Sequence, residues 1–161
     1  MKWDTIDAMP KSVDAAATGL KSSALTDDLS FLLARANAIA LAAGNAALAE
    51  HGLKARSYSV LVLSAGAARP SQRELAEFLR LDPSQVVSLV DDLQSRGLVE
   101  RRPDPADRRA NVVVATEAGR ALAESARESA RAAEERVHAE LSGSERETLT
   151  ALLRRLAFPA A

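Results

Sequence analysis

The sequence has no cysteine, which excludes disulfides, thiol redox switches and cysteine-ligated metals. It has two histidines, His51 and His138, and a zinc site would need both together with well-placed carboxylates, so we expect no metal. It also lacks a glycine-rich phosphate loop and any serine, histidine and aspartate set in recognisable context. We therefore expect no cofactor and no enzymatic activity.

An excess of positive charge is absent as well. Lys and Arg number 21 and Asp and Glu 22, for a net charge of −1, which excludes a histone-like protein that holds nucleic acid by bulk charge. Between Arg69 and Arg109, eight arginines face eight acidic residues, but between Arg101 and Arg109 four arginines face two aspartates. Nucleic-acid contact would therefore depend on a few placed arginines and on helix N-termini.

The chain has 161 residues, of which 47% are hydrophobic, as in one globular domain with a short appendage. Its first residues lack the charged-then-apolar order of a signal peptide. The apolar run Leu29–Ala49 contains Arg35, which alone would cost about 2.5–3.5 kcal/mol in hydrocarbon. We expect instead a helix buried in a protein interface, no membrane contact and a cytoplasmic location.

Capping residues predict a series of helices. Thr26 is the expected cap of a helix that continues until Gly52, and a second helix is expected over Lys54–Ala65. Two short helices follow with a tight join: Ser71 and Glu74 form a capping box that opens the first, and Asp82 with Pro83 opens the second, which Gly97 ends. So short a join requires the two helices to cross steeply.

After Gly97 the period changes to that of strands. Leu98–Arg102 and Asn111–Ala115 predict a hairpin around the charged loop Pro103–Arg109. Thr116 then caps a long helix with an apolar stripe, and Ser142 with Glu145 opens the last helix. The stripe consists of Ala118, Leu122, Ala126, Ala130, Ala133, Val137 and Leu141. The predicted fold is mainly α with a small two- or three-stranded β wing, a winged helix-turn-helix flanked by dimerisation helices.

The run from Ser71 to Gly119 resembles the MarR family of bacterial transcription regulators. The most specific pieces are Arg96-Gly-Leu-Val and the loop Asp104-Pro-Ala-Asp-Arg-Arg109. The resemblance covers about residues 25–157. It implies an N-terminal extension (1–24), a dimerisation helix (25–52), a winged helix-turn-helix DNA-binding lobe (53–116) and C-terminal dimerisation helices (117–161).

The helix after Asp82 is the expected recognition helix. Ser84, Gln85 and Ser88 lie on its first turn and a half, away from its apolar stripe, where small polar groups can meet base edges in the major groove. Ser71 and Arg73, at the start of the preceding helix, are placed to meet phosphate. Solvation alone is the plainer alternative for all these side chains.

The charged loop is the expected wing. The resemblance implies that one wing arginine, which we assign to Arg109, enters the minor groove, and that Asp107 braces it by an ion pair. Arg108 lies beside it near the loop tip, and Arg101 and Arg102 could add backbone contacts. A charged solvated loop is again the alternative.

The family forms dimers through its first and last helices, so we expect a homodimer that reads a pseudo-palindrome, with recognition helices about 34–36 Å apart. Family members also bind small aromatic or phenolic effectors, for which the candidate side chains are Arg35, Asn45, His51, Arg56 and Tyr58. We expect a ligand-responsive repressor of its own or a neighbouring gene. The alternative is a winged-helix dimer that acts as a protein-interaction adaptor without DNA.

Overall fold

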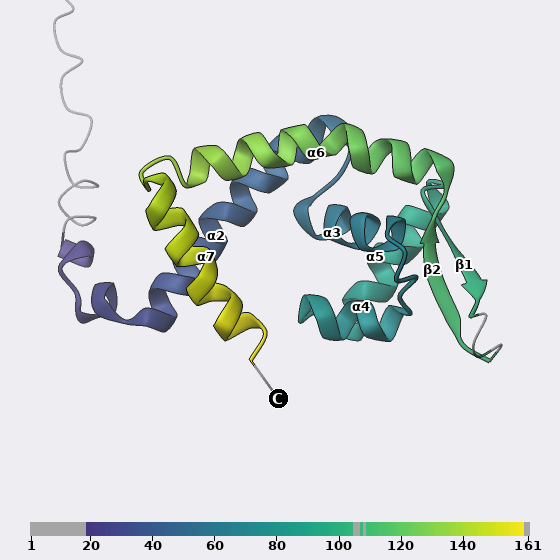
Figure 1. The fold of residues 1–161 in the computed structure, drawn as a ribbon, viewed down its shortest axis with the longest axis horizontal. Coiled ribbons are helices and arrows are strands. Elements are labelled where there is room, and N and C mark those ends of the chain that lie inside the picture. The colour runs from purple at the N-terminus through teal and green to yellow at the C-terminus, as the bar shows by residue number, and fades with distance from the viewer. Residues whose placement is uncertain (1–18, 105–106, 108, 160–161) are drawn as a thin grey trace, which may run out of the picture. The chain divides into compact units, whose positions relative to one another are not determined.

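The computed structural model describes residues 19–104, 107 and 109–159, which form two compact units, Met1–Ile39 and Ala40–Ala161. Most of the expected N-terminal extension (1–24) lies outside the described residues. The elements are named as in Figure 1. They are η1 (Ala24–Asp27), α2 (Leu29–Leu48), η2 (Ala49–His51), α3 (Ala55–Ala65), α4 (Gln72–Leu79), α5 (Pro83–Ser95), β1 (Val99–Pro103), β2 (Asn111–Ala115), α6 (Glu117–Val137) and α7 (Gly143–Ala157).

The start of α2 corrects one prediction. The side chain of Asp28 caps this helix by accepting the backbone N–H of Phe31 at 2.7 Å. Thr26 instead lies in the short helix η1, where its hydroxyl donates to the carbonyl of Ser23. The Thr26 cap was therefore wrong, since η1 occupies that position and aspartate is a stronger N-cap than threonine.

Among the described residues, one helical stretch, Leu29–His51, is long and apolar enough to cross a membrane by length and composition alone. Its run of alanines and leucines has no acidic residue in its first turn and no basic residue in its last. The same composition suits a helix that packs closely on another protein helix.

The second unit has one hydrophobic core, built from α3, α5, the hairpin and the first half of α6 (Figure 1). Its fully buried side chains include Leu61, Val86, Val90, Leu93 and Val113. The three from α5 follow the helical period, so one face of α5 is buried and the other is left free.

The sheet is an antiparallel pair in which Val99 faces Ala115 and Pro103 faces Asn111. Beside this pair, a single isolated bridge joins Ser71 to Val112, and the N–H of Val113 donates to the carbonyl of Pro70. The predicted wing is confirmed, with β1 displaced by one residue from Leu98–Arg102.

The predicted caps at Ser71, Asp82, Thr116 and Ser142 are all confirmed, each side chain accepting a backbone N–H of the first turn. In the two capping boxes the carboxylate at the third position of the helix accepts the backbone N–H of the capping serine. Glu74 Oε2, for example, accepts the N–H of Ser71 at 2.7 Å. Hydrogen bonds from Ser71 lower the pKa of Glu74, and those from Ser142 lower the pKa of Glu145.

These caps make stability depend on pH. A carboxylate whose pKa is lowered by folding stabilises fully above its unfolded pKa, and the contribution is lost as the pH falls through the folded pKa. The free energy of unfolding of wild type should therefore exceed that of Ser71→Ala by more at pH 7 than at pH 3. Urea denaturation at the two pH values measures this, and a difference that does not shrink in acid contradicts the assignment.

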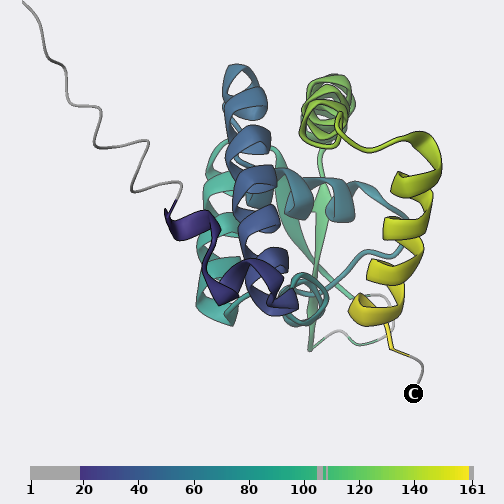
Figure 2. The ribbon, with the colours of Figure 1, turned by 90° about the vertical axis from the view of Figure 1, so that its left-hand side faces the viewer.

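The long helix α6 buries Gly119, Ala123, Ala126 and Ala133. Ala118, expected to begin the stripe, is exposed, because Gly119 is the residue that packs against Leu98. Within the second unit, the chain turns sharply after the end of α6 and continues as helix α7 (Figures 1 and 2). None of its residues is buried, and it exposes Leu149, Leu152, Leu153 and Leu156.

Candidate nucleic-acid interface

Helices α4 and α5 are joined by a three-residue turn. Arg80 ends α4 in the left-handed conformation, at φ 52°, and the N–H of Leu81 donates to the carbonyl of Ala76 at 3.1 Å. This is the hydrogen bond that closes a helix with a left-handed residue, a place usually held by glycine. The next helix starts at once at Asp82, so the join is as tight as the sequence predicted.

The free face of α5 carries the predicted base-reading side chains. Ser84, Gln85 and Ser88 are exposed, while Val86 and Val90 on the opposite side are fully buried. The hydroxyl of Ser84 donates to the carboxylate of Asp82, which lowers the pKa of that carboxyl. The structure therefore brings these three side chains together on one solvent-facing surface.

The side-chain oxygen of Gln85 accepts a hydrogen bond from the guanidinium of Arg56 at 3.3 Å. Since Arg56 stands in the first turn of α3, this bond ties the start of α3 to the recognition helix. No local pattern predicts this pairing, because the two residues are 29 positions apart and both are exposed.

The two side chains predicted to contact phosphate at the start of α4, Ser71 and Arg73, differ in how firmly they are held by other residues. Ser71 is engaged in the capping box, its hydroxyl donating to Glu74. Arg73 pairs with Glu77 one turn later at 2.9 Å, but its side chain is 87% exposed. An exposed pair of this kind contributes little to stability, so Arg73 can exchange its partner for a phosphate.

Arg101 is held inside the lobe. Its guanidinium donates to Gln72 at 2.6 Å, to Gln94 at 2.8 Å and to Asp91 at 2.5 Å. These partners lie on α4 and α5, so Arg101 fastens the base of the wing to both helices of the helix-turn-helix. The brace could not be predicted from the sequence, because its acceptors are polar side chains of α4 and α5 that form no local pattern with Arg101.

Arg102 points to the other face of the hairpin, since successive residues of a strand alternate. It pairs with Glu100 on the same strand. The two arginines predicted together as backbone contacts therefore lie on opposite faces of the wing.

At the wing tip Arg109 is exposed. The carboxylate of Asp107 accepts the backbone N–H of Arg109 at 3.0 Å, and the carbonyl of Asp107 accepts the N–H of Ala110 at 2.9 Å. In the described part of the chain, the carboxylate of Asp107 makes no ion pair with the guanidinium of Arg109. The predicted ion pair is therefore wrong, and Asp107 instead holds the backbone of Arg109. Such a turn leaves the guanidinium available. Arg108 lies outside the described residues.

The effector candidates mostly have partners of their own. Asn45 accepts the backbone N–H of Ala55 at 2.8 Å and so caps α3, while Tyr58 packs half-buried against the core. His51 Nε2 lies 3.0 Å from the hydroxyl of Ser129 on α6 and 3.4 Å from Glu50. Arg35 belongs to the first unit, whereas the other four candidates belong to the second.

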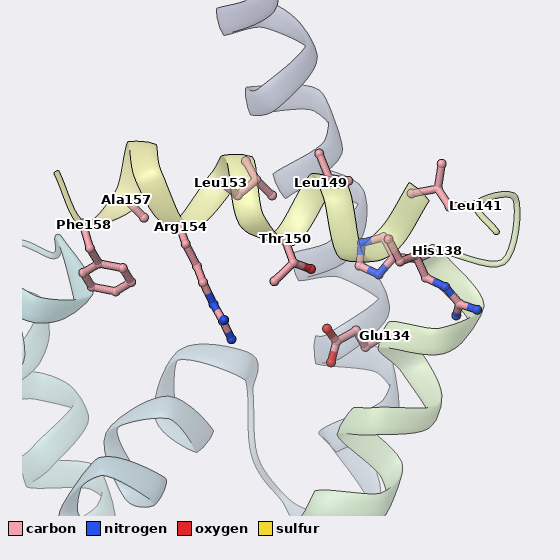
Figure 3. Close-up of a pocket in the computed structure, with 10 residues that line it drawn as sticks. Glu134, His138, Leu141, Leu149, Thr150, Leu153, Arg154, Ala157 and Phe158 are labelled. Carbon is pink, nitrogen blue, oxygen red and sulfur yellow. The ribbon is translucent and has the colours of Figure 1, made fainter. Parts of the chain in front are cut away.

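A cavity of about 290 Å³ lies between the end of α6 and the inner face of α7 (Figure 3). Glu134 and His138 border it from α6, and Thr150 and Arg154 from α7. The remaining wall is largely apolar, from Leu141, Leu149, Leu153, Ala157 and Phe158. Exposed apolar patches of this kind often mark the place where another protein surface packs.

Comparisons with known proteins agree with this geometry. The sequence model described as "MarR family" matches residues 51–110. Among solved structures, CouR from Rhodococcus jostii RHA1 bound to p-coumaroyl-CoA is 44% identical with a TM-score of 0.78, over 87% of this chain and 99% of that one. The MarR family protein Rv2887 of Mycobacterium tuberculosis in complex with DNA is 28% identical with a TM-score of 0.64, over 80% and 96%. Rv2887 is also known in complex with salicylic acid.

The HTH-type transcriptional repressor NicR of Pseudomonas putida is 36% identical over 86 residues, which span 53% of this chain and 54% of that protein. The match thus covers about half the length of this curated relative. The fold and these similarities define a winged helix-turn-helix transcriptional regulator. The chain is also 43% identical to a MarR family transcriptional regulator from Rhodococcus sp. RHA1, with a TM-score of 0.79, over 86% of this chain and 100% of that one. The chain therefore belongs to the MarR family, which is a family of regulators and not of enzymes.

Proposed function

We propose that the chain is a cytoplasmic, homodimeric repressor, without enzymatic activity, that binds a pseudo-palindromic operator and is released by a small aromatic effector. The observation that supports this most is the exposed polar face of α5, together with the contacts of Arg101, which fix the base of the hairpin that carries the exposed Arg109 to α4 and α5. The lobe thus offers a helix for the major groove and a wing arginine for the minor groove.

The contacts divide into two kinds. Ser84, Gln85 and Ser88 meet base edges, while Arg73 and the start of α4 at Ser71 meet phosphate. In the wing, Arg109 enters the minor groove and Arg108 and Arg102 meet the backbone. Arg101 acts as a positioning residue, since its guanidinium is already bound to three side chains.

Dimerisation is proposed to use residues 25–52 and 117–161 around the DNA-binding lobe at 53–116. Helix α7 supports this, because a row of exposed leucines along 15 residues is costly in water and needs a partner. The apolar helix α2 is proposed to pack there too, and not in a membrane.

The proposed effector is a small aromatic or phenolic acid, free or as a thioester, like the ligands bound by CouR and Rv2887. Arg35, Asn45, His51, Arg56 and Tyr58 remain the candidate groups. Arg56 offers a route to the DNA, since a carboxylate that captures its guanidinium takes it from Gln85 on the recognition helix. Salicylate should then weaken operator binding in wild type and have less effect in Arg56→Gln, as an anisotropy titration would measure.

A winged-helix adaptor that binds protein and not DNA is the second candidate, supported by the small side chains at Ser84 and Ser88. The two candidates differ in a single property. The adaptor has no affinity for duplex DNA at low salt, whereas the repressor does.

The Arg109→Ala variant tests the proposed interface. Loss of one phosphate-neutralising arginine per subunit should weaken operator binding and lower the slope of log affinity against log salt by up to about one per subunit. Fluorescence anisotropy at salt concentrations from about 50 to about 200 mM measures the affinity and its salt slope. Arg131→Ala, on the outer face of α6 and paired with Glu135, is the matched control. An unchanged slope and affinity in Arg109→Ala removes this residue from the interface.

A further inference from the structure

A second hollow, of about 390 Å³, lies on the face of the hairpin opposite the Arg101 brace. It is bordered by the end of α3, the turn that follows, both strands and the first turn of α6. Its wall is mainly polar and contains three arginines, Arg69, Arg102 and Arg120, with the carboxylates of Glu100 and Glu117.

The arginines give the hollow a positive surplus. Glu100 is already paired with Arg102, and Arg120 is fixed in place by donating to the carbonyl of Ala115 at 2.7 Å. Arg69 makes no ion pair among the described residues. The N-terminal end of the 21-residue helix α6 adds partial positive charge on the same side.

A buried hydroxyl without a partner in the described part of the chain belongs to a residue in the wall of the hollow. Ser64 lines the hollow, is 2% exposed, and its Oγ has no hydrogen-bond partner among the described residues. Buried hydroxyls are nearly always paired, and an unpaired one is unfavourable. The Oγ is covered in this conformation, so the Ser64 side chain would have to turn before it could donate to an acceptor oxygen in the hollow, where that oxygen would face the guanidinium groups.

We propose that this hollow binds a phosphate group, through the guanidinium groups of Arg69, Arg102 and Arg120 and the hydroxyl of Ser64. Planar guanidinium forks match phosphate oxygens in charge and in spacing, and a hydroxyl donor completes the set. The phosphate belongs either to a free phosphate compound or to the DNA backbone. The site shares no residue with the α5 surface or with the effector candidates, but it shares Arg102 with the backbone contacts proposed for the wing.

The test for a free phosphate is isothermal titration of the protein alone with inorganic phosphate, against chloride at equal ionic strength. Saturable binding is expected, weakened about tenfold in Arg69→Gln, as for loss of one charge-assisted contact. Ser64→Ala should bind phosphate more weakly while its melting temperature stays the same or rises, because the lost hydroxyl had no partner. Glu117→Gln should bind more tightly, since it removes a negative charge from the rim, and Arg131→Gln should match wild type.

If the DNA backbone is the source, the protein alone shows no saturable phosphate binding. Arg69→Gln then lowers the salt slope of duplex binding by about one per subunit, whereas Arg131→Gln leaves it unchanged. Circular dichroism and melting temperature confirm that each variant is folded. Phosphate binding that Arg69→Gln does not weaken, or the absence of both effects, overturns the proposal.

Discussion

Replacing Gly119 with alanine is expected to lower the free energy of unfolding by about 1–3 kcal/mol, the usual cost of forcing an extra carbon into packed structure. A Cβ at this position would lie 1.9 Å from the carbonyl oxygen of Leu98 and 3.2 Å from the Cδ1 of Leu61. Neither neighbour can withdraw easily, because the Leu98 oxygen accepts the N–H of Thr116 at 3.0 Å and Leu61 is fully buried.

Thermal unfolding followed by circular dichroism measures the effect, at about 2–4 °C of melting temperature per kcal/mol in a chain of this size. Gly143→Ala is the matched control, since a Cβ there meets no atom within 4 Å and Gly143 also stands in the first turn of a helix. A Gly119→Ala variant as stable as Gly143→Ala would contradict the close approach of α6 to Leu98.

Replacing Leu152 with glutamate is expected to convert the dimer to a monomer and to abolish tight operator binding. Leu152 lies on α7 and is 49% exposed in the single chain, so a charge there leaves the fold of the protomer intact. Buried in a dimer interface, the same unpaired charge is strongly unfavourable. Because two linked half-sites gain about 10²–10⁴ in affinity over one, DNA binding should fall by that order.

Analytical ultracentrifugation at micromolar protein distinguishes the 17.1 kDa chain from a particle of twice that mass. Arg155→Glu, also on α7, is the control for added negative charge. A Leu152→Glu protein that remains a dimer places the interface elsewhere on the chain.

Sequence reasoning succeeded where the signal was local. The caps at Ser71, Asp82, Thr116 and Ser142 satisfy backbone groups within three residues, so each could be predicted from a short pattern. The predicted cap at Thr26 was wrong because Asp28, which is also a good cap, follows two residues later and Thr26 itself lies in a short 3₁₀ helix.

The candidate site was harder to predict, because its geometry depends on contacts between distant residues. Arg101 and Arg102 are neighbours in sequence but lie on opposite faces of β1, one braced by α4 and α5 and the other beside Arg69 and Arg120. The hydrogen bond between Arg56 and Gln85 and the orphan hydroxyl of Ser64 also follow from tertiary packing alone. A pattern of residue types therefore predicted which polar residues share the exposed face of α5, while the contacts of each arginine required the fold.

The net charge of −1 has a definite meaning for DNA binding. A near-neutral lobe has little bulk attraction for duplex, so non-specific affinity should be low and binding should depend on placed groups such as Arg109 and Arg73. Specific binding should therefore be sensitive both to salt and to the spacing of the two lobes in the dimer.

The most direct test of a DNA-binding homodimer is a gel-shift titration with the DNA upstream of its own gene, at low salt and with the dimer confirmed. The account predicts a discrete shift, two chains per site and protection of two half-sites about one helical turn apart. A confirmed dimer that shifts neither this DNA nor that of the neighbouring gene at low salt would contradict the account and favour the adaptor.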